Sequence, residues 1–261
     1  MREDENASLT QSDGVARKKT TRAPTPKYTT VANTILRAVE MGRWKPGDQL
    51  PSETELAEKM RVSLGTVQRG LKVLTDQGLV LRHHGRGTFV GSGRAPDEQL
   101  RHFRFVTEGS RDLLPVVSRV LSIEMVRSKG PWAEFLGPED SYIRLLRILH
   151  VGGEFELFSE MHLSGDKFKD LLKVAPEDLH GVLVRDYLTT HFNTPTLRLE
   201  QRLWCGLLPP RVCNLIHVPR NSMGLTWLLL AFTYRDAPAI HQKVYVPPTD
   251  RQLQILDFSA S

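Results

Sequence analysis

Apolar side chains recur every three or four residues in two segments of the first eighty residues. The spacing predicts two amphipathic helices, over residues 29–41 and from residue 63 onward, each with one buried face. The positions that form these faces are Val31, Ile35, Ala38 and Val39, then Val67, Leu71 and Leu74. Gly42 and Gly78 follow the two segments, and glycine is common just past a helix end.

Capping residues predict a third, shorter helix between these two. Ser52 stands three residues before Glu55, which is the spacing of a capping box. Ser63 suits the start of the next helix, because its hydroxyl can accept from a free backbone N–H. Two short strand-like segments occupy residues 79–90, joined by a glycine-rich turn at 83–87. This order of elements predicts a winged helix-turn-helix.

After about residue 100 the pattern changes to strand-like and helix-like stretches in alternation. We expect strands near 116–126, 142–151, 155–163, 196–204, 226–234 and 240–245. We expect helices near 132–136, 167–173, 181–190 and 210–216. Gly152 and Gly153 lie between two strand-like runs, which is typical of a hairpin. The second part is therefore expected to be an α+β domain with a mainly antiparallel sheet.

Composition suggests where the chain divides. We expect a disordered basic tail at 1–27, the winged helix-turn-helix at 28–91, a linker at 92–99, the α+β domain at 100–250 and a C-terminal tail at 251–261. The basic cluster at 17–19 is able to contact DNA phosphates or the minor groove. A solvated tail is the interpretation that we favour.

The overall composition excludes few classes of function, but it indicates the cellular compartment. A net charge of +5 is compatible with a polyanionic partner without identifying one. Cys205 and Cys213 do not form a metal-like pair, so we expect buried thiols in a reducing cytosol. The most apolar run, 225–232, is too short to span a bilayer. We therefore expect a cytoplasmic protein without cofactor or metal, nucleoid-associated when bound to DNA.

The helix that starts at Ser63 has the surface that a DNA-reading helix needs. Gln68 and Arg69 lie away from its buried stripe, where they can pair with adenine and guanine. Gly65 costs about 1 kcal/mol relative to alanine, which close approach to DNA would explain. A helical pair that packs on another molecule is the alternative, but the hairpin beside it favours DNA. The residues expected to contact DNA are Thr54, Ser63, Leu64, Gly65, Thr66, Gln68, Arg69, His84, Gly85, Arg86, Gly87 and Thr88.

The second domain has no catalytic motif: no phosphate loop, no G-x-S-x-G elbow and no spaced metal ligands. Glu154, Glu156 and Glu160 alternate on one strand face with His162, which could suggest acid–base chemistry. A solvated strand face is the interpretation that we favour.

Arg147 is more informative, because it shares an alternating apolar face with Leu145 and Leu149. A buried guanidinium costs several kcal/mol unless an anion or a dense set of hydrogen bonds compensates it. The residues alone leave two explanations equally open. One is a guanidinium that binds a ligand carboxylate or phosphate, and the other is an internal salt bridge.

At this point the chain resembles a known family. The segments KPGDQLPSE at 45–53, residues 62–67 and GRGTFV at 85–90 are similar to the N-terminal domain of GntR-type bacterial transcription regulators. The resemblance implies a homodimer that binds palindromic double-stranded operator DNA. The family often has arginine at the positions of Thr54, Leu64 and Gln68, so the operator is expected to differ from the commonest one.

The second domain resembles the UTRA effector-binding domain of the histidine-utilisation-repressor-like (HutC) subgroup, whose fold is similar to chorismate lyase. The similar segments are 103–105, 114–116, 132–137, 143–147 and 153–155. Arg147 falls on the first of two pocket arginines of the subgroup, whereas Leu149 replaces the second. Further polar pocket positions fall on Ser159, Gly181, Leu183 and Ile240. The effector-binding residues implied are Arg147, Ser159, Arg104, Phe105, Phe155 and Leu149.

Because most polar positions of that pocket are lost, we expect a less polar effector with a single anionic group, such as an organic or aromatic carboxylate. The chain is thus expected to be a transcription regulator, in particular a repressor, whose operator affinity is changed by a small molecule. The two alternatives are a chorismate-lyase-like enzyme fused to a DNA-binding domain and a dimeric DNA binder that needs no effector.

Overall fold

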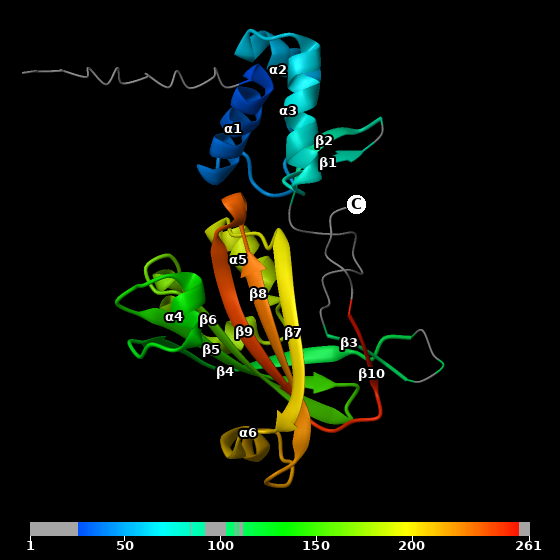
Figure 1. Cartoon of the computed structure of the whole chain (residues 1–261), viewed down its shortest axis with the longest axis vertical. Helices are drawn as coiled ribbons and strands as arrows, with labels where there is room; N and C mark the ends of the chain where they lie inside the picture. Colours follow the sequence, from blue (N-terminus) through cyan, green and yellow to red (C-terminus); the bar gives the residue numbers. More distant parts are fainter. Residues whose placement is uncertain (1–25, 84, 92–102, 108, 110–111, 256–261) are drawn as a thin grey trace, which may run out of the picture.

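The computed structural model describes residues 26–83, 85–91, 103–107, 109 and 112–255. Nearly all of the basic tail, His84 in the hairpin turn and the linker 92–99 lie outside the described residues. A small helical domain stands at one end of a larger domain built on a sheet (Figure 1). No helix in the described part of the chain is long and apolar enough to cross a membrane.

Three helices and a hairpin form the N-terminal domain. They are α1 (Lys27–Glu40), α2 (Glu53–Met60), α3 (Leu64–Asp76), β1 (Val80–His83) and β2 (Gly87–Val90). The apolar stripes of α1 and α3 meet in one core, in which Ile35, Val67 and Leu71 are fully buried. The winged helix-turn-helix that the periodicity predicts is confirmed.

The predicted caps form as expected. The Ser52 hydroxyl accepts from the Glu55 backbone N–H at 3.2 Å, and the Ser52 backbone N–H donates to the Glu55 carboxylate at 2.7 Å. The Ser52 backbone N–H, together with its hydroxyl 2.8 Å from Glu55 Oε2, donates to the carboxylate and lowers the pKa of Glu55. Ser63 accepts from the Thr66 backbone N–H at 3.3 Å and so begins α3. Both helix starts are therefore set by short-range sequence.

A six-stranded antiparallel sheet forms the larger domain, with the strand order β4-β5-β6-β9-β8-β7. The strands are β4 (Val116–Val126), β5 (Tyr142–Val151), β6 (Phe155–Ser164), β7 (Arg198–Leu207), β8 (Met223–Phe232) and β9 (Pro238–Val246). Gly152 and Gly153 join β5 to β6, both with positive φ, as the hairpin signal predicts. Two strands that the pattern does not reveal, β3 (Arg104–Val106) and β10 (Gln252–Gln254), pair with each other. Three residues are too few to show alternation.

Helices cover both faces of the sheet. α5 (Val184–Phe192) packs Val184 and Leu188 into the main core. On the opposite face lie α4 (Pro131–Leu136) and α6 (Pro210–Leu215). Three short 3₁₀ segments, η1 (Lys169–Lys173), η2 (Pro176–Leu179) and η3 (Tyr234–Asp236), complete the fold. The helix expected at 167–173 is thus a 3₁₀ turn, and the one expected from 181 begins three residues later.

Two expectations about exposure are wrong. The strand face of Glu160 and His162 is not solvated, because α4 and α6 cover it; the two residues are 7% and 2% exposed. Cys213 is buried as expected, but Cys205 is exposed because β7 is the outer strand of the sheet. Both errors concern which other segments pack against a strand, and the sequence of the strand itself does not predict this.

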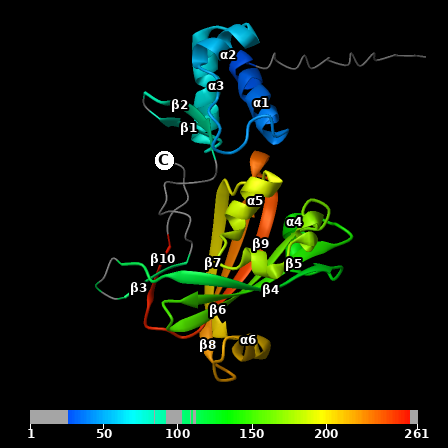
Figure 2. The same ribbon diagram turned by 180° about the vertical axis from the view of Figure 1, so that it is seen from behind.

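The two domains touch through α1. Arg235, at the turn between β8 and β9, forms a two-point ion pair with Glu40, and its Nη2 lies 2.9 Å from Oε2. Tyr234 is buried in the core of the N-terminal domain. Its hydroxyl donates to Asn193 Oδ1 at 3.1 Å. Figure 2 shows α5, which ends at Asn193, across the end of the sheet that faces the N-terminal domain.

Candidate functional site

Most of the residues expected to contact DNA lie together on the N-terminal domain. Those of α3 and the start of α2 are solvent-exposed, apart from the half-buried Thr66. Leu64 is 45% exposed although it is apolar, as is expected of a side chain that meets a partner. The Ser63 and Thr66 hydroxyls lie 2.8 Å apart and belong to the helix cap. These two hydroxyls therefore also have a structural role.

Glu53 is a part of this surface that the sequence reasoning missed. Its carboxylate accepts from Gln68 Nε2 at 2.9 Å and forms an ion pair with Arg82 of β1. The carboxylate thus ties together α2, α3 and the hairpin. No local pattern points to it, because its partners lie 15 and 29 residues away. The Gln68 carboxamide is thus held in place by Glu53.

Gln49 supports the tip of the wing. Gln49 Nε2 donates to the Arg86 carbonyl oxygen at 2.9 Å. Gly87 has φ of +112°, and a Cβ at this position would lie 2.6 Å from Gln49 Nε2. Glycine is required here both for the backbone angle and for the space. Gly85 and Arg86 are exposed at the tip, whereas Thr88 is half-buried.

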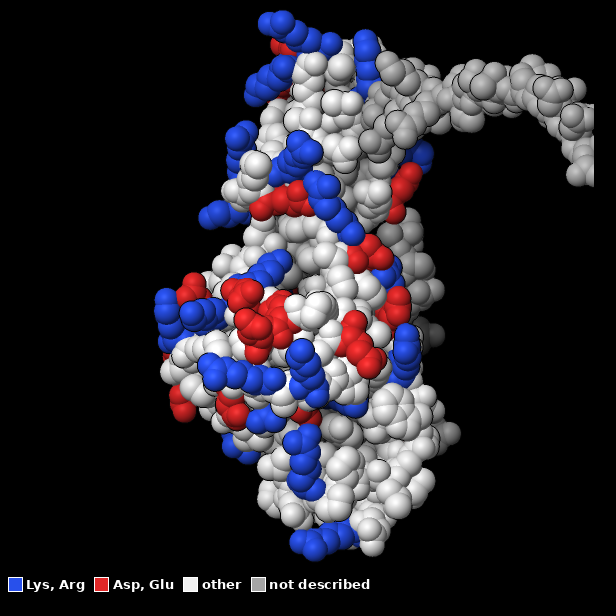
Figure 3. Space-filling view, turned by 60° about the vertical axis from the view of Figure 1, so that its left-hand side comes forward, with Lys and Arg blue, Asp and Glu red and all other residues white. Residues whose placement is uncertain are grey.

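The surface charge of this domain suits a polyanion. Residues 27–91 contain ten Lys or Arg and six Asp or Glu, a difference of four positive charges. Figure 3 shows Lys and Arg side chains along the outer edge of the N-terminal domain. Such charge releases counterions from DNA and provides affinity without sequence preference.

A cavity of about 430 Å³ lies between the sheet and the start of α5. Arg147, Leu149, Gly181 and Leu183 line it, so four positions implied by the resemblance meet there. Arg147 is 5% exposed, and its Nη2 lies 3.4 Å from Ser159 Oγ. Its Nε has no hydrogen-bond partner, and burial lowers its pKa to about 10. Among the described residues no carboxylate pairs with Arg147, which argues against the internal salt bridge.

Arg185 is a second guanidinium on this cavity, and the sequence reasoning missed it. It is 8% exposed, and its Nη2 donates to Gln242 Oε1 at 3.2 Å. Gln242 Nε2 in turn donates to Ser159 Oγ at 2.9 Å. Burial, and then the charge of Arg147, lower the pKa of Arg185 to about 9. A cation in the first turn of a helix is unfavourable, because it lies at the positive end of the helix dipole. This unfavourable position was the one sequence feature that could have pointed to a role for Arg185.

The remaining predicted pocket residues lie outside the cavity wall. Phe105 and Phe155 pack edge to face, with ring centroids 5.2 Å apart, in the core. Arg104 Nε donates to Gln254 Oε1 at 3.4 Å across the β3–β10 pair. The aromatic side chain that does line the cavity is Phe103.

Comparison with known proteins gives consistent matches. The family model "Bacterial regulatory proteins, gntR family" matches residues 27–90. The HTH-type transcriptional repressor NagR of Bacillus subtilis is 32% identical over 230 residues, which cover 85% of this chain and 92% of that protein. The histidine utilization repressor of Klebsiella aerogenes is 44% identical over 68 residues, which cover 26% of this chain and 28% of that protein.

Solved structures also match the larger domain, and one of them supports its fold. It is the ligand-binding domain of a regulator assigned to the GntR family from Bordetella bronchiseptica, with a TM-score of 0.53 and 16% identity, covering 59% of this chain and 96% of that chain. At this identity the likeness supports the fold alone. The relatives are transcriptional repressors and not enzymes, which contradicts the enzyme alternative. The chain is 32% identical to a relative that it matches over 92% of that protein's length, and its DNA-binding domain matches the family model. The chain therefore belongs to the GntR family of bacterial regulatory proteins.

Proposed function

We propose that this protein is a transcriptional repressor that binds a palindromic operator as a homodimer and responds to a small-molecule effector. The effector carries one anionic group, in the first instance a carboxylate, which binds Arg147. The single observation that carries the proposal is the buried Arg147 guanidinium, which faces a cavity without a carboxylate partner among the described residues. Two relatives that are named as repressors support the direction of regulation.

The chemistry of the cavity favours an anion with an apolar body. A volume of about 430 Å³ lies within the range of about 300–1,000 Å³ that is usual for small-molecule sites. Phe103, Leu149 and Val184 supply apolar surface. Burial lowers the pKa of both Arg147 and Arg185, and the charge of Arg147 lowers the pKa of Arg185 further. An anion between the two guanidinium groups offsets both this repulsion and their lost hydration. A carboxylate has two oxygens with which to accept from both guanidinium groups.

α5 provides a physical connection from the cavity to the DNA-binding domain. Val184, Arg185 and Asp186 in its first turn line the cavity. Asn193 at its end donates to the carbonyl oxygen of Val39 in α1. If α5 can adopt two placements relative to the sheet, an effector that binds one placement more tightly favours it. Because α5 contacts α1, the N-terminal domain then moves together with α5. Equal affinity for both placements would change nothing.

A thermal-shift screen tests the effector site. Carboxylates are added to the wild type and to Arg147→Met, which keeps the length of the side chain but removes the charge. A carboxylate at a hundred times its Kd adds about 2.7 kcal/mol, or roughly 5–10 °C in Tm for a protein of this size. Arg82→Met is a matched control, because Arg82 lies in the wing domain. The proposal is contradicted if no carboxylate raises the Tm of the wild type, or if Arg147→Met responds as strongly as the wild type.

The regulatory link needs a second measurement. Operator fragments are titrated with the wild type, with and without the carboxylate found in the screen. We expect the carboxylate to change the operator Kd in the wild type and not in Arg147→Met. A protein that binds its operator equally in all four conditions is a DNA binder without an effector. The stoichiometry of the complex, measured by light scattering, tests the homodimer.

A further inference from the structure

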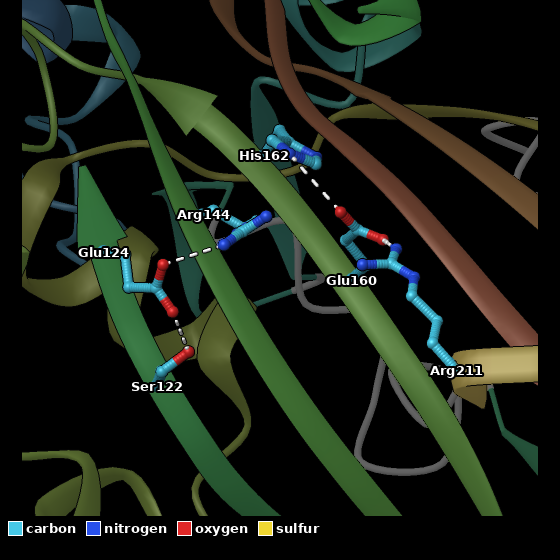
Figure 4. A network of polar contacts seen from close by, with 6 residues as sticks. All are labelled: Ser122, Glu124, Arg144, Glu160, His162 and Arg211. Atoms are coloured by element: carbon cyan, nitrogen blue, oxygen red, sulfur yellow. Dashed lines mark hydrogen bonds and ion pairs between the residues drawn. The ribbon is translucent and has the colours of Figure 1, made fainter. Parts of the chain in front are cut away.

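A second cavity, of about 240 Å³, lies on the opposite face of the sheet from Arg147. We call it the α4–α6 cavity, because Trp132 of α4 and Arg211 of α6 form two of its walls. Its floor is the face of β5, β6 and β9 that carries Arg144, His162 and Lys243. Figure 4 shows how Arg144, Glu160 and His162 project from neighbouring strands and how Arg211 reaches in from α6.

Strand register brings these side chains together. Arg144 is paired with His162, and His162 is paired with His241, so the three form one row across β5, β6 and β9. Glu160 and Lys243 are paired in the next row. Because side chains two residues apart share a face, both rows project to the same side. Polar side chains from three strands therefore converge on one point.

Several polar atoms in this cavity are buried without a hydrogen-bond partner. They are Trp132 Nε1, Arg144 Nε, both ring nitrogens of His162, and His241 Nδ1. His162 and His241 are 2% and 3% exposed. Proteins satisfy about 90% or more of such groups, so a cluster of them in one cavity indicates an occupant that accepts hydrogen bonds. Most of these atoms carry, or can carry, a hydrogen to donate.

The charges of the cavity specify the sign of the occupant. Arg144 pairs with Glu124 at 2.8 Å, and Arg211 pairs with Glu160. Lys243 is half-buried and has no ion pair among the described residues, which leaves one positive charge without compensation. The two histidines do not add to it. Burial, together with nearby cations, lowers their pKa values to about 3 for His162 and about 4 for His241.

The occupant is held by donors along one side of the cavity. The Trp132 ring stacks on His162 with centroids 3.9 Å apart, so the indole N–H has a fixed direction. Arg144 Nε, Lys243 and the neutral histidine rings complete the set of donors. A water molecule can accept some of these bonds but leaves the charge of Lys243 unbalanced. A monoanion satisfies both needs.

We propose that the α4–α6 cavity is a second ligand site, distinct from the Arg147 pocket, that binds a small organic monocarboxylate. The volume limits the ligand to a molecule smaller than the effector that the Arg147 pocket accommodates. The carboxylate lies between Lys243 and the Arg144–His162 row and accepts from Trp132 Nε1. Glu160 and Arg211 close the cavity on the side of α6.

The experiment uses the full chain, and acetate and benzoate are the probes. The side-chain NMR signals of His162 and His241 are assigned by single His→Gln variants and followed while each probe is added at constant ionic strength, with chloride as the reference. We expect saturable shifts of both signals. The same shifts are expected in Arg147→Met, because that variant removes only the guanidinium of the other pocket.

Two further variants test the contacts. Lys243→Met removes the unpaired charge, and we expect binding to be weaker by about tenfold or more. Trp132→Phe keeps the ring on His162 but removes the N–H donor, and we expect a severalfold loss. Lys243 has no ion pair with any residue that the structure describes, so Lys243→Met is expected to unfold at the wild-type temperature.

Four results overturn the proposal. These are no saturable shift with either probe, shifts that survive in Lys243→Met, shifts that disappear in Arg147→Met, and binding of inorganic phosphate without binding of either carboxylate. The last result would assign the cavity to a different anion.

Discussion

The side-chain amide of Asn193 donates to the carbonyl oxygen of Val39 at 2.9 Å, so the residue that ends α5 also caps α1 in the other domain. Asn193 adopts φ of +48°, a conformation that asparagine and glycine tolerate better than other residues. The Tyr234 hydroxyl donates to Oδ1 of Asn193 and fixes the orientation of its amide. This arrangement places the C-cap of α5 directly on α1.

Asn193→Gly tests this contact between the domains. Glycine accepts the backbone angle, so the change removes only the side-chain hydrogen bonds, each worth about 1 kcal/mol. We expect faster hydrogen exchange at the end of α1, measured by mass spectrometry, and a smaller effect of the effector on operator affinity. Asn221→Gly is a matched control, because Asn221 also has positive φ but lies between α6 and β8, and Figure 1 shows α6 at the end of the larger domain away from α1. Equal responses of the two variants would argue against the contact.

Gly87→Ala is expected to disrupt the wing. The new Cβ would lie 2.6 Å from Gln49 Nε2, at a φ of +112° that alanine rarely adopts. The free energy of unfolding should fall by about 1–3 kcal/mol, and the operator Kd should rise. Gly85→Ala has positive φ but open space around the Cβ, so its loss of stability should be smaller. Urea unfolding of both variants checks the order.

Arg69→Ala and Arg86→Ala are expected to weaken DNA binding in different ways. If Arg69 reads a guanine, its loss costs about 1–3 kcal/mol and relaxes the base preference at one operator position. If Arg86 contacts phosphate, its loss weakens binding to all sequences and lowers the salt slope by about one. Binding to an operator library at several salt concentrations separates the two effects. Identical profiles for the two variants would contradict these assignments.

Stability should fall on mild acidification because of His162 and His241. Burial and nearby cations lower their folded pKa values to about 3 and about 4, from 6.5 in the unfolded chain. Between pH 6.5 and pH 4 the unfolded chain therefore binds more protons than the native protein. The free energy of unfolding decreases as pH falls through this window, by up to about 1.4 kcal/mol per unit for each ring.

Urea unfolding across that pH window measures the slope. His241→Gln removes one of the two titrating rings, so the slope attributable to the pair should drop by about half. The groups that face the rings, Arg144, Glu160 and Lys243, stay in place in this variant. An unchanged slope would show that other groups cause the acid sensitivity.

Local sequence was sufficient to predict a structural feature wherever the residues that cause it lie within a few positions of each other. The capping box of Ser52 and Glu55, the stripe of Val67 and Leu71, and the Gly152–Gly153 turn were all predictable, because each depends on spacing along one helix or hairpin. The burial of Arg147 was predictable for the same reason, since alternation along β5 assigns each side chain to a face.

The limits of local sequence appear where separate elements meet. The residues around Arg185 in the sequence do not predict that it lines the same cavity as Arg147. Those around Glu53 do not predict that it contacts Gln68 and Arg82. The strand β6 shows Glu160 and His162 on one face but not that α4 and α6 will bury them. The sequence by itself determined the winged helix-turn-helix, the long strands, the face on which Arg147 lies and the resemblance to its family. Only the tertiary structure decided which charged groups become neighbours, because burial and pairing depend on packing between segments that are distant along the chain.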